Sequence, residues 1–279
     1  MADISAKSLI VDLLSASPEQ RIPVGGLVRV AEVFGIAESS LRVALSRLCA
    51  AGTVIPVCRG EYSLSGAAAP LQRRVSSWRS ATDDRVPWDG GWVCVHGPIK
   101  GRSKAALAER RALRLLGFAE VDSSLRVRPD NLRGGVAALR ERLQGLGLGE
   151  AHLVGRLDAL TDADVTRLAG HWDPRSIGAG HDAMREHLTS SAAGLLELPL
   201  DEALRESFHL GGEAIRQIVL DPLLPEELGD PAPLRALVRA MDDYDRLGRG
   251  LWEAFFGDAA TRAPARDGGL PAESIGGLA

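Results

Sequence analysis

Three short amphipathic segments in close succession constrain the fold of this 279-residue chain most strongly. Apolar residues recur at intervals of three and four across residues 6–15, 24–34 and 38–51, which is the spacing of one helix face. Gly35 and Gly52 follow the second and third segments. Glycine commonly ends a helix because it accepts a positive φ. The pattern therefore predicts three short helices joined by tight turns.

A β-hairpin is predicted directly after these helices. Residues 53–65 form two short β-prone stretches that meet at Arg59-Gly60. Helix, helix, tight turn, helix and hairpin is the order of elements in a winged helix-turn-helix, so we predict this fold for residues 1–79. In such a domain the third helix enters the major groove of DNA with a small, polar and basic outer face.

The outer face of the third predicted helix has the composition that this role requires. Its inward positions are Leu41, Ala44, Leu45 and Leu48. The other positions are rich in serine and arginine, whose side chains suit contacts with phosphates and base edges. We predict that the DNA-binding residues are Ser39, Ser40, Arg42, Val43, Ser46, Arg47 and, at the hairpin tip for a phosphate contact, Arg59.

The charge distribution favours nucleic acid as the partner of this region. The whole chain holds 33 basic and 37 acidic residues, which excludes a uniformly basic coat. Residues 1–80, however, carry nine basic and six acidic residues, a net charge of +3 that leaves −7 for the remainder. An alternative stays open, since winged helices also serve as protein-interaction modules without DNA binding, and serine and arginine also occupy ordinary solvated helix faces.

The pattern of elements changes from residue 92 onward. We predict strands over 92–96, 118–121, 125–128 and 151–157, with helices over 103–116 and 132–143. This βαββαβ order is that of a ferredoxin-like split βαβ fold, here assigned to a central domain of residues 80–160. A capping box at Thr161 then opens an all-helical C-terminal domain over 161–257. Its helical segments are predicted at 162–169, 179–193, 201–219, 231–247 and 248–256.

Residues 258–279 are small, rich in Gly and Pro and without periodicity, so we predict a disordered tail. The predicted fold class of the whole chain is α+β.

Three stretches of sequence, in this order, carry a resemblance to a known family. The first is VGGLVRVAEVFGIAESSLRVALSRLCAAGTV (24–54) followed by RGEYSLS (59–65). The second is WDGGW (88–92) with the later run RRALRLLGF (110–118), and the third is IRQIVLDPLLPEEL (215–228). Together they resemble the PaaX family of bacterial transcriptional repressors, known from phenylacetate catabolism. Two departures stand out: Gly229-Asp230-Pro231 replaces the family's Trp-Pro-Gly segment, and His181 replaces a frequent aromatic.

The resemblance implies a ligand-responsive repressor that binds operator DNA as a homodimer and is released by a small effector. It also implies an acyl-coenzyme A effector, with phenylacetyl-coenzyme A as the family precedent. Such a site needs cations for the phosphates and an apolar slot for the acyl group. Candidates for both are Trp88, Trp92, Lys100, Arg102, Arg110, Arg111, Arg114 and Trp172. The alternative for these residues is that the arginines form a solvated helix face and the tryptophans belong to the core.

The sequence lacks a complete version of the catalytic motifs that we considered. The stretch from Gly97 to Lys104 (GPIKGRSK) lies where a phosphate-binding loop would, but three residues separate its glycines instead of four and Arg102 replaces the lysine. His96-Gly97 stands where ferredoxin-like CRISPR-associated nucleases need a metal-binding carboxylate. The six histidines form no H-E-x-x-H pair, and no G-x-S-x-G elbow occurs. We therefore expect no enzyme, cofactor or metal site, with an acyl-coenzyme A enzyme as the alternative.

The cysteines and the N-terminus indicate a cytoplasmic protein. Cys49, Cys58 and Cys94 form no C-x-x-C pair, and three thiols cannot all pair within one chain. Asp3 and Asp12 interrupt the apolar N-terminal run, which speaks against a signal peptide. No stretch approaches eighteen consecutive apolar residues, so no membrane span or membrane partner is expected.

Overall fold

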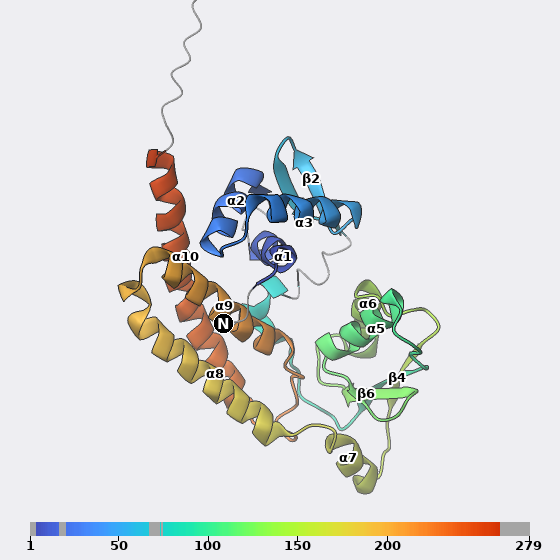
Figure 1. Cartoon of the computed structure of the whole chain (residues 1–279). Coiled ribbons are helices and arrows are strands. Elements are labelled where there is room, and N and C mark those ends of the chain that lie inside the picture. Colours follow the sequence, from blue (N-terminus) through green and yellow to red (C-terminus); the bar gives the residue numbers. More distant parts are fainter. Residues whose placement is uncertain (1–3, 17–20, 67–72, 74, 263–279) are drawn as a thin grey trace, which may run out of the picture.

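The computed structural model describes residues 4–16, 21–66, 73 and 75–262 (Figure 1). Within them the chain combines helices with two small antiparallel sheets, which confirms the predicted α+β class. The last helix, α10, continues to Arg262, so the tail predicted from residue 258 begins inside this helix. The rest of that tail lies outside the described residues.

Three helices and a hairpin form the N-terminal unit. Its elements are α1 (Ala6–Ala16), β1 (Ile22–Pro23), α2 (Val24–Val33), α3 (Glu38–Ala50), β2 (Val54–Cys58) and β3 (Glu61–Leu64). The apolar faces of the three helices meet in one core, in which Leu9, Leu27 and Leu41 are completely buried. Gly35 and Gly52 adopt φ angles of 68° and 66°, and this left-handed conformation ends α2 and α3 as the sequence predicts.

A four-stranded sheet with two helices forms the central unit. Its elements are β4 (Trp92–His96), α5 (Lys104–Leu115), β5 (Ala119–Glu120), β6 (Leu125–Pro129), α6 (Gly135–Gly145) and β7 (Leu153–Leu157). The strand order is β5-β6-β4-β7, and each neighbouring pair is antiparallel. Successive side chains of a strand point to opposite faces. Val93 and Val95 therefore share a core with α5 and α6, whereas Trp92 packs on the other face with Leu168.

The WDGGW stretch is a tight connection into β4. The Trp88 indole Nε1 donates a hydrogen bond to the Gly91 carbonyl at 2.6 Å, and the Gly91 N–H donates to Asp89 Oδ1 at 3.0 Å. A Cβ at Gly91 would collide with the guanidinium of Arg156, so a larger residue there would displace this side chain. The motif is therefore explained by packing at the entry to the sheet.

Arg156 on β7 joins three acidic residues. Its guanidinium lies 2.6 Å from Asp89, 2.6 Å from Asp130 and 2.7 Å from Asp158. The hydrogen bond from Arg156 and that from the Gly91 N–H lower the pKa of Asp89. The Asp130 side chain is only 6% exposed, so Arg156 is the group that compensates its charge.

Long helices form the C-terminal unit. They are α7 (Asp162–Ala169), α8 (Pro174–Gly194), α9 (Leu200–Val219) and α10 (Ala232–Arg262), with short 3-10 turns η2 (Trp78–Asp84) and η3 (Leu195–Glu197). The helix α10 packs along both α8 and α9 (Figure 1). The linker turn η2 is fixed to this bundle, because Trp78 is buried and Arg79 pairs with Asp242 at 2.7 Å and also with Asp245.

Replacing Arg156 tests the account of the WDGGW connection. Arg156→Ala should lower the free energy of unfolding clearly more than the control below, because the buried Asp130 carboxylate loses its compensating charge. Urea unfolding followed by circular dichroism measures this change. The control Arg167→Ala removes a pair with Asp164 on the surface, and should change stability by less than about 0.5 kcal/mol. Equal effects of the two substitutions would contradict the assigned role of Arg156.

Candidate functional site

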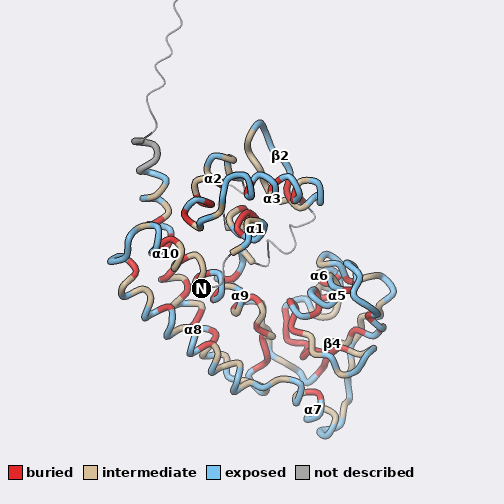
Figure 2. The backbone as a smooth tube through the Cα atoms, viewed as in Figure 1, coloured by how far each residue is buried: buried red, intermediate tan, exposed pale blue. Residues whose placement is uncertain are grey.

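The outer face of α3 carries the residues predicted to bind DNA. Leu41, Leu45 and Leu48 are at most 4% exposed and face the core, which turns the opposite side of the helix to solvent. Figure 2 shows exposed positions along the length of this helix. The exposed residues include Ser39, Ser40, Arg42, Val43, Ser46 and Arg47. These six side chains are therefore brought together on one accessible surface.

The two arginines of this surface differ in their surroundings. Arg42 Nε and Nη2 lie 2.7 Å and 2.6 Å from Glu38 Oε1, one helical turn earlier. This exposed pair favours one direction of the guanidinium, and the acidic Glu38 also suits the N-terminal turn of a helix. Arg47 makes no ion pair with any residue that the structure describes. Its guanidinium is thus free to take a new acceptor.

The hairpin lies beside α3 and extends the surface. Arg59 is exposed at the hairpin tip, and Gly60 there adopts a φ of 82°. An open groove of about 360 Å³ separates the hairpin from the helix and is lined by Val24, Arg42, Leu45, Ser46, Cys49, Pro56 and Tyr62. The exposed apolar Ile55 and Val57 also lie on the hairpin, and the sequence analysis missed them. The side chains of a strand normally alternate between a buried and an exposed face. This rule predicts that only alternate residues of β2 are exposed, whereas Ile55 and Val57 are both exposed together with their neighbour Pro56.

Aromatic contacts attach this unit to the C-terminal helices. Phe34, after α2, packs edge-on against Phe208 of α9 with ring centroids 5.2 Å apart. Arg29 of α2 donates a hydrogen bond from Nη2 to the Phe255 carbonyl at 2.9 Å and lies over the Phe255 ring at 4.7 Å. The position of the α3 surface on the molecule therefore depends on α9 and on the last turns of α10.

The predicted effector tryptophans pack against one another. Trp88 meets Trp92 edge-on at 5.6 Å, and Trp92 stacks on Trp172 at 6.0 Å. Trp92 is completely buried between the sheet and α7. This arrangement favours the core interpretation of these three residues.

The predicted effector cations lie on the other side of the sheet. Lys100, Arg102, Arg111 and Arg114 are exposed on α5 or on the loop before it. Arg110 donates to the carbonyl oxygens of Ile99 and Gly101, both at 2.8 Å, and so holds that loop. Because α5 covers the face opposite Trp92, the structure does not bring these cations and the tryptophans into one site.

Two helix caps predicted from the sequence are confirmed nearby. Ser103 accepts a hydrogen bond from the Ala106 N–H, and Thr161 accepts one from the Asp164 N–H, each at 3.2 Å.

The described part of the chain contains no group of three or more His, Cys, Asp or Glu side chains arranged to hold a metal ion. Among the same residues, no helix combines the length and apolar character that a membrane span requires.

Comparison with known families bears on the N-terminal unit. Residues 5–68, from α1 through the hairpin, match the family model described as PaaX-like protein. The match spans less than a quarter of the chain, so the similarity to PaaX-like proteins is shown for the N-terminal unit. This similarity suggests a transcription regulator in general. No curated protein matches the chain.

A solved structure extends the comparison to the other units. The chain resembles the structure titled "Uncharacterized protein Rv0674 from Mycobacterium tuberculosis" with a TM-score of 0.55 and 23% sequence identity. The match covers 90% of this chain and 98% of that one. At this identity the similarity shows a shared fold and nothing about function.

Replacing Phe34 tests the attachment of the α3 surface. Phe34→Ala should lower the free energy of unfolding by about 2–3 kcal/mol, because it removes the ring that packs on α9. It should also speed amide hydrogen exchange in α2. The control Val43→Ala removes a half-exposed side chain from α3 and should change stability by less than about 0.5 kcal/mol. A Phe34 variant as stable as this control would contradict the proposed attachment.

Proposed function

We propose that this PaaX-like chain is a ligand-responsive transcriptional repressor that binds operator DNA through α3 and the hairpin. The observation that supports this best is the common exposure of seven side chains chosen from sequence alone: Ser39, Ser40, Arg42, Val43, Ser46, Arg47 and Arg59. Serine, arginine and a single apolar side chain suit phosphates, guanine edges and thymine methyl groups respectively.

The proposed architecture follows the three units of the chain. Residues 1–79 would be a winged helix-turn-helix domain, in which β2 and β3 form the wing. Residues 80–160 would be a ferredoxin-like domain, an assignment supported by the strand order β5-β6-β4-β7. Residues 161–257 would be a helical domain.

Docking of α3 in a major groove sets the roles of its side chains. Arg42, held by Glu38, would present a fixed guanidinium to a base edge, while Arg47 would take a phosphate or a second base. Arg59 would contact the backbone from the wing. We propose a homodimer, because two such helices related by a two-fold axis would contact half-sites roughly 34–36 Å apart or a multiple of that distance.

The proposed effector is a small molecule, for which an acyl-coenzyme A such as phenylacetyl-coenzyme A is the family precedent. The exposed cations Lys100, Arg102, Arg111 and Arg114 suit its phosphates. Trp92 is enclosed in the core, so other side chains would take the acyl group. The effector must bind the DNA-competent state and the incompetent state with different affinities, because otherwise it cannot shift the equilibrium between them. A repressor of this kind acts in the cytoplasm.

Two arginine substitutions test the proposed groove contacts. Arg42→Ala and Arg47→Ala should each weaken binding to a selected operator duplex by about 1–3 kcal/mol, measured by fluorescence anisotropy. Arg111→Ala, an exposed arginine on α5, serves as the matched control and should leave DNA affinity unchanged. If both α3 variants bind as well as the control, the groove assignment is wrong.

Salt dependence separates DNA binding from a protein-interaction role. Contacts with several phosphates make log K fall with log salt at a slope of about −0.9 per phosphate. We expect a steep slope for the intact chain on duplex DNA and a shallower one for Arg59→Ala. A flat profile would favour the alternative, in which the winged helix is a protein-interaction surface.

A further inference from the structure

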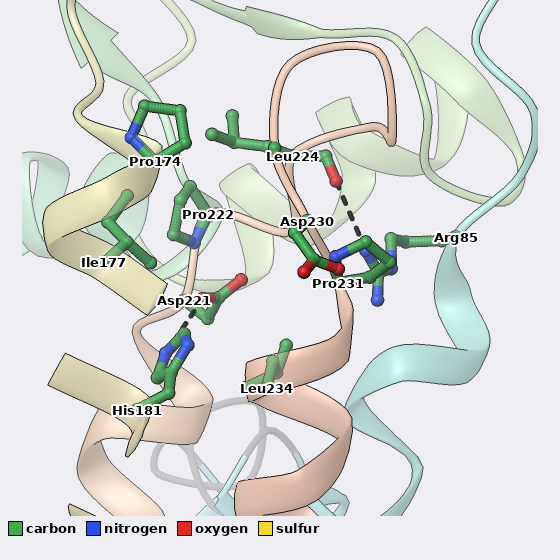
Figure 3. Close-up of a pocket in the computed structure, with 11 residues that line it drawn as sticks. Arg85, Pro174, Ile177, His181, Asp221, Pro222, Leu224, Asp230, Pro231 and Leu234 are labelled. Carbon is green, nitrogen blue, oxygen red and sulfur yellow. Dashed lines mark hydrogen bonds and ion pairs between the residues drawn. The ribbon is translucent and has the colours of Figure 1, made fainter. Parts of the chain in front are cut away.

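A small cavity lies where the linker, α8, α10 and the segment between α9 and α10 converge (Figure 3). Its volume is about 30 Å³, and it opens to the surface. The wall is mixed. Ile177 of α8, Leu224 in the segment before α10 and Leu234 of α10 are apolar, whereas Arg85, His181, Asp221 and Asp230 are polar. Ligand sites use a few such polar groups to orient what they bind.

Arg85 is the cation that faces this cavity from the linker. Its Nη1 donates to the Leu224 carbonyl at 3.3 Å, as the dashed line in Figure 3 marks. Its Nη2 is buried and has no hydrogen-bond partner among the described residues. No described carboxylate lies within ion-pair distance of this guanidinium. Burial accordingly lowers the pKa of Arg85, because the charged form is poorly solvated there.

The buried acid of the cavity already has partners within the protein. Asp221 Oδ2 lies 3.2 Å from His181 Nε2, and both side chains are at most 7% exposed. Asp221 Oδ1 also accepts a hydrogen bond from the Leu223 N–H at 2.7 Å. This carboxylate is bonded to α8 and to its own loop. It attracts the Arg85 guanidinium at longer range but makes no ion pair or hydrogen bond with it.

Asp230 is the other acid that lines the cavity, and it accepts a hydrogen bond from the Ala232 N–H at 2.8 Å at the start of α10. Glu226, outside the lining, lies 3.3 Å from Arg235. A water molecule at the cavity would satisfy the free N–H of Arg85 but not its charge. An anion would do both, and charge-assisted bonds of this kind are the strong ones.

We propose that this cavity binds the carboxylate of a small apolar monocarboxylic acid, with Arg85 Nη2 as the donor. The volume admits the carboxylate group, while the apolar part of the ligand would lie against Ile177 and the neighbouring prolines at the opening. A single negative charge fits better than a phosphate dianion, because Asp221 and Asp230 lie close by. The site is separate from the cations proposed for coenzyme A.

A ligand in this position would join the linker to the C-terminal helices. Arg85 follows η2, whose Trp78 and Arg79 pack on α10, and η2 leads directly from the N-terminal unit. An effect of the ligand on operator affinity would rest on the proposed function. Binding of the ligand itself does not, so the two proposals can fail independently.

The test compares carboxylates with their amides in the absence of DNA. Sodium butyrate and sodium benzoate should bind the full chain in calorimetry and raise its melting temperature, whereas butyramide and benzamide should do neither. Arg85→Gln should weaken carboxylate binding by roughly tenfold or more, since it replaces a charged donor by a neutral one. Arg167→Gln, an exposed arginine on α7, is the matched control and should bind like the natural chain.

Several results would overturn the proposal. They are the absence of binding by either carboxylate, equal binding of the amides, and undiminished binding by Arg85→Gln. If Arg85→Gln does not fold by circular dichroism, methyl NMR of the natural chain replaces it. Addition of butyrate should then shift the methyl signals of Ile177 and Leu234, and unchanged signals at saturating butyrate would reject the site.

Discussion

Burial of three leucines determines what α3 can do. Leu41, Leu45 and Leu48 occupy one stripe of the helix, and removing each from water stabilises the fold by about 2 kcal/mol. This burial sets the rotation of the helix about its axis. Every serine and arginine between the leucines must then face solvent together, as a single surface. The candidate DNA-binding face is thus a consequence of core packing rather than of its own interactions.

The α3 surface is held on the molecule through aromatic side chains, which are scarce in this sequence. Four of the five phenylalanines, Phe34, Phe208, Phe255 and Phe256, gather with Trp252 where α2 meets α9 and α10. The linker turn η2 then packs on α10 and leads to the sheet. The C-terminal unit reaches the same sheet through Leu223, whose carbonyl accepts a hydrogen bond from Asn131 Nδ2 at 2.8 Å. The three units therefore share contacts at both ends of the C-terminal bundle.

Much of the secondary structure could be predicted from local signals. Glycine at positions 35 and 52, the capping serine at 103 and the leucine periodicities place most elements within a few residues. The start of α8 was predicted five residues too late, at residue 179. Gly178 and Gly180 weaken the helical pattern there, and the decisive signal was Asp173, which accepts a hydrogen bond from the Ser176 N–H ahead of Pro174.

Sites that combine distant segments were harder to predict. The sequence could not show on which face of the sheet α5 lies, and so it grouped Trp92 with Arg111, although they lie on opposite sides. Arg85 carries no local motif, because its cavity forms only where the linker meets helices that lie far later in the chain, from Pro174 onward. The α3 surface was predictable because one helix supplies nearly all of it.

Amide NMR of the full chain with bound DNA tests the central claim most directly. The duplex would be one that the protein itself selects from a random-sequence library. The account predicts that the largest shifts fall on the amides of Ser39 to Arg47 and of the hairpin around Arg59. A selected duplex that leaves these amides unchanged and shifts another surface, or a library from which no duplex is selected, would contradict it.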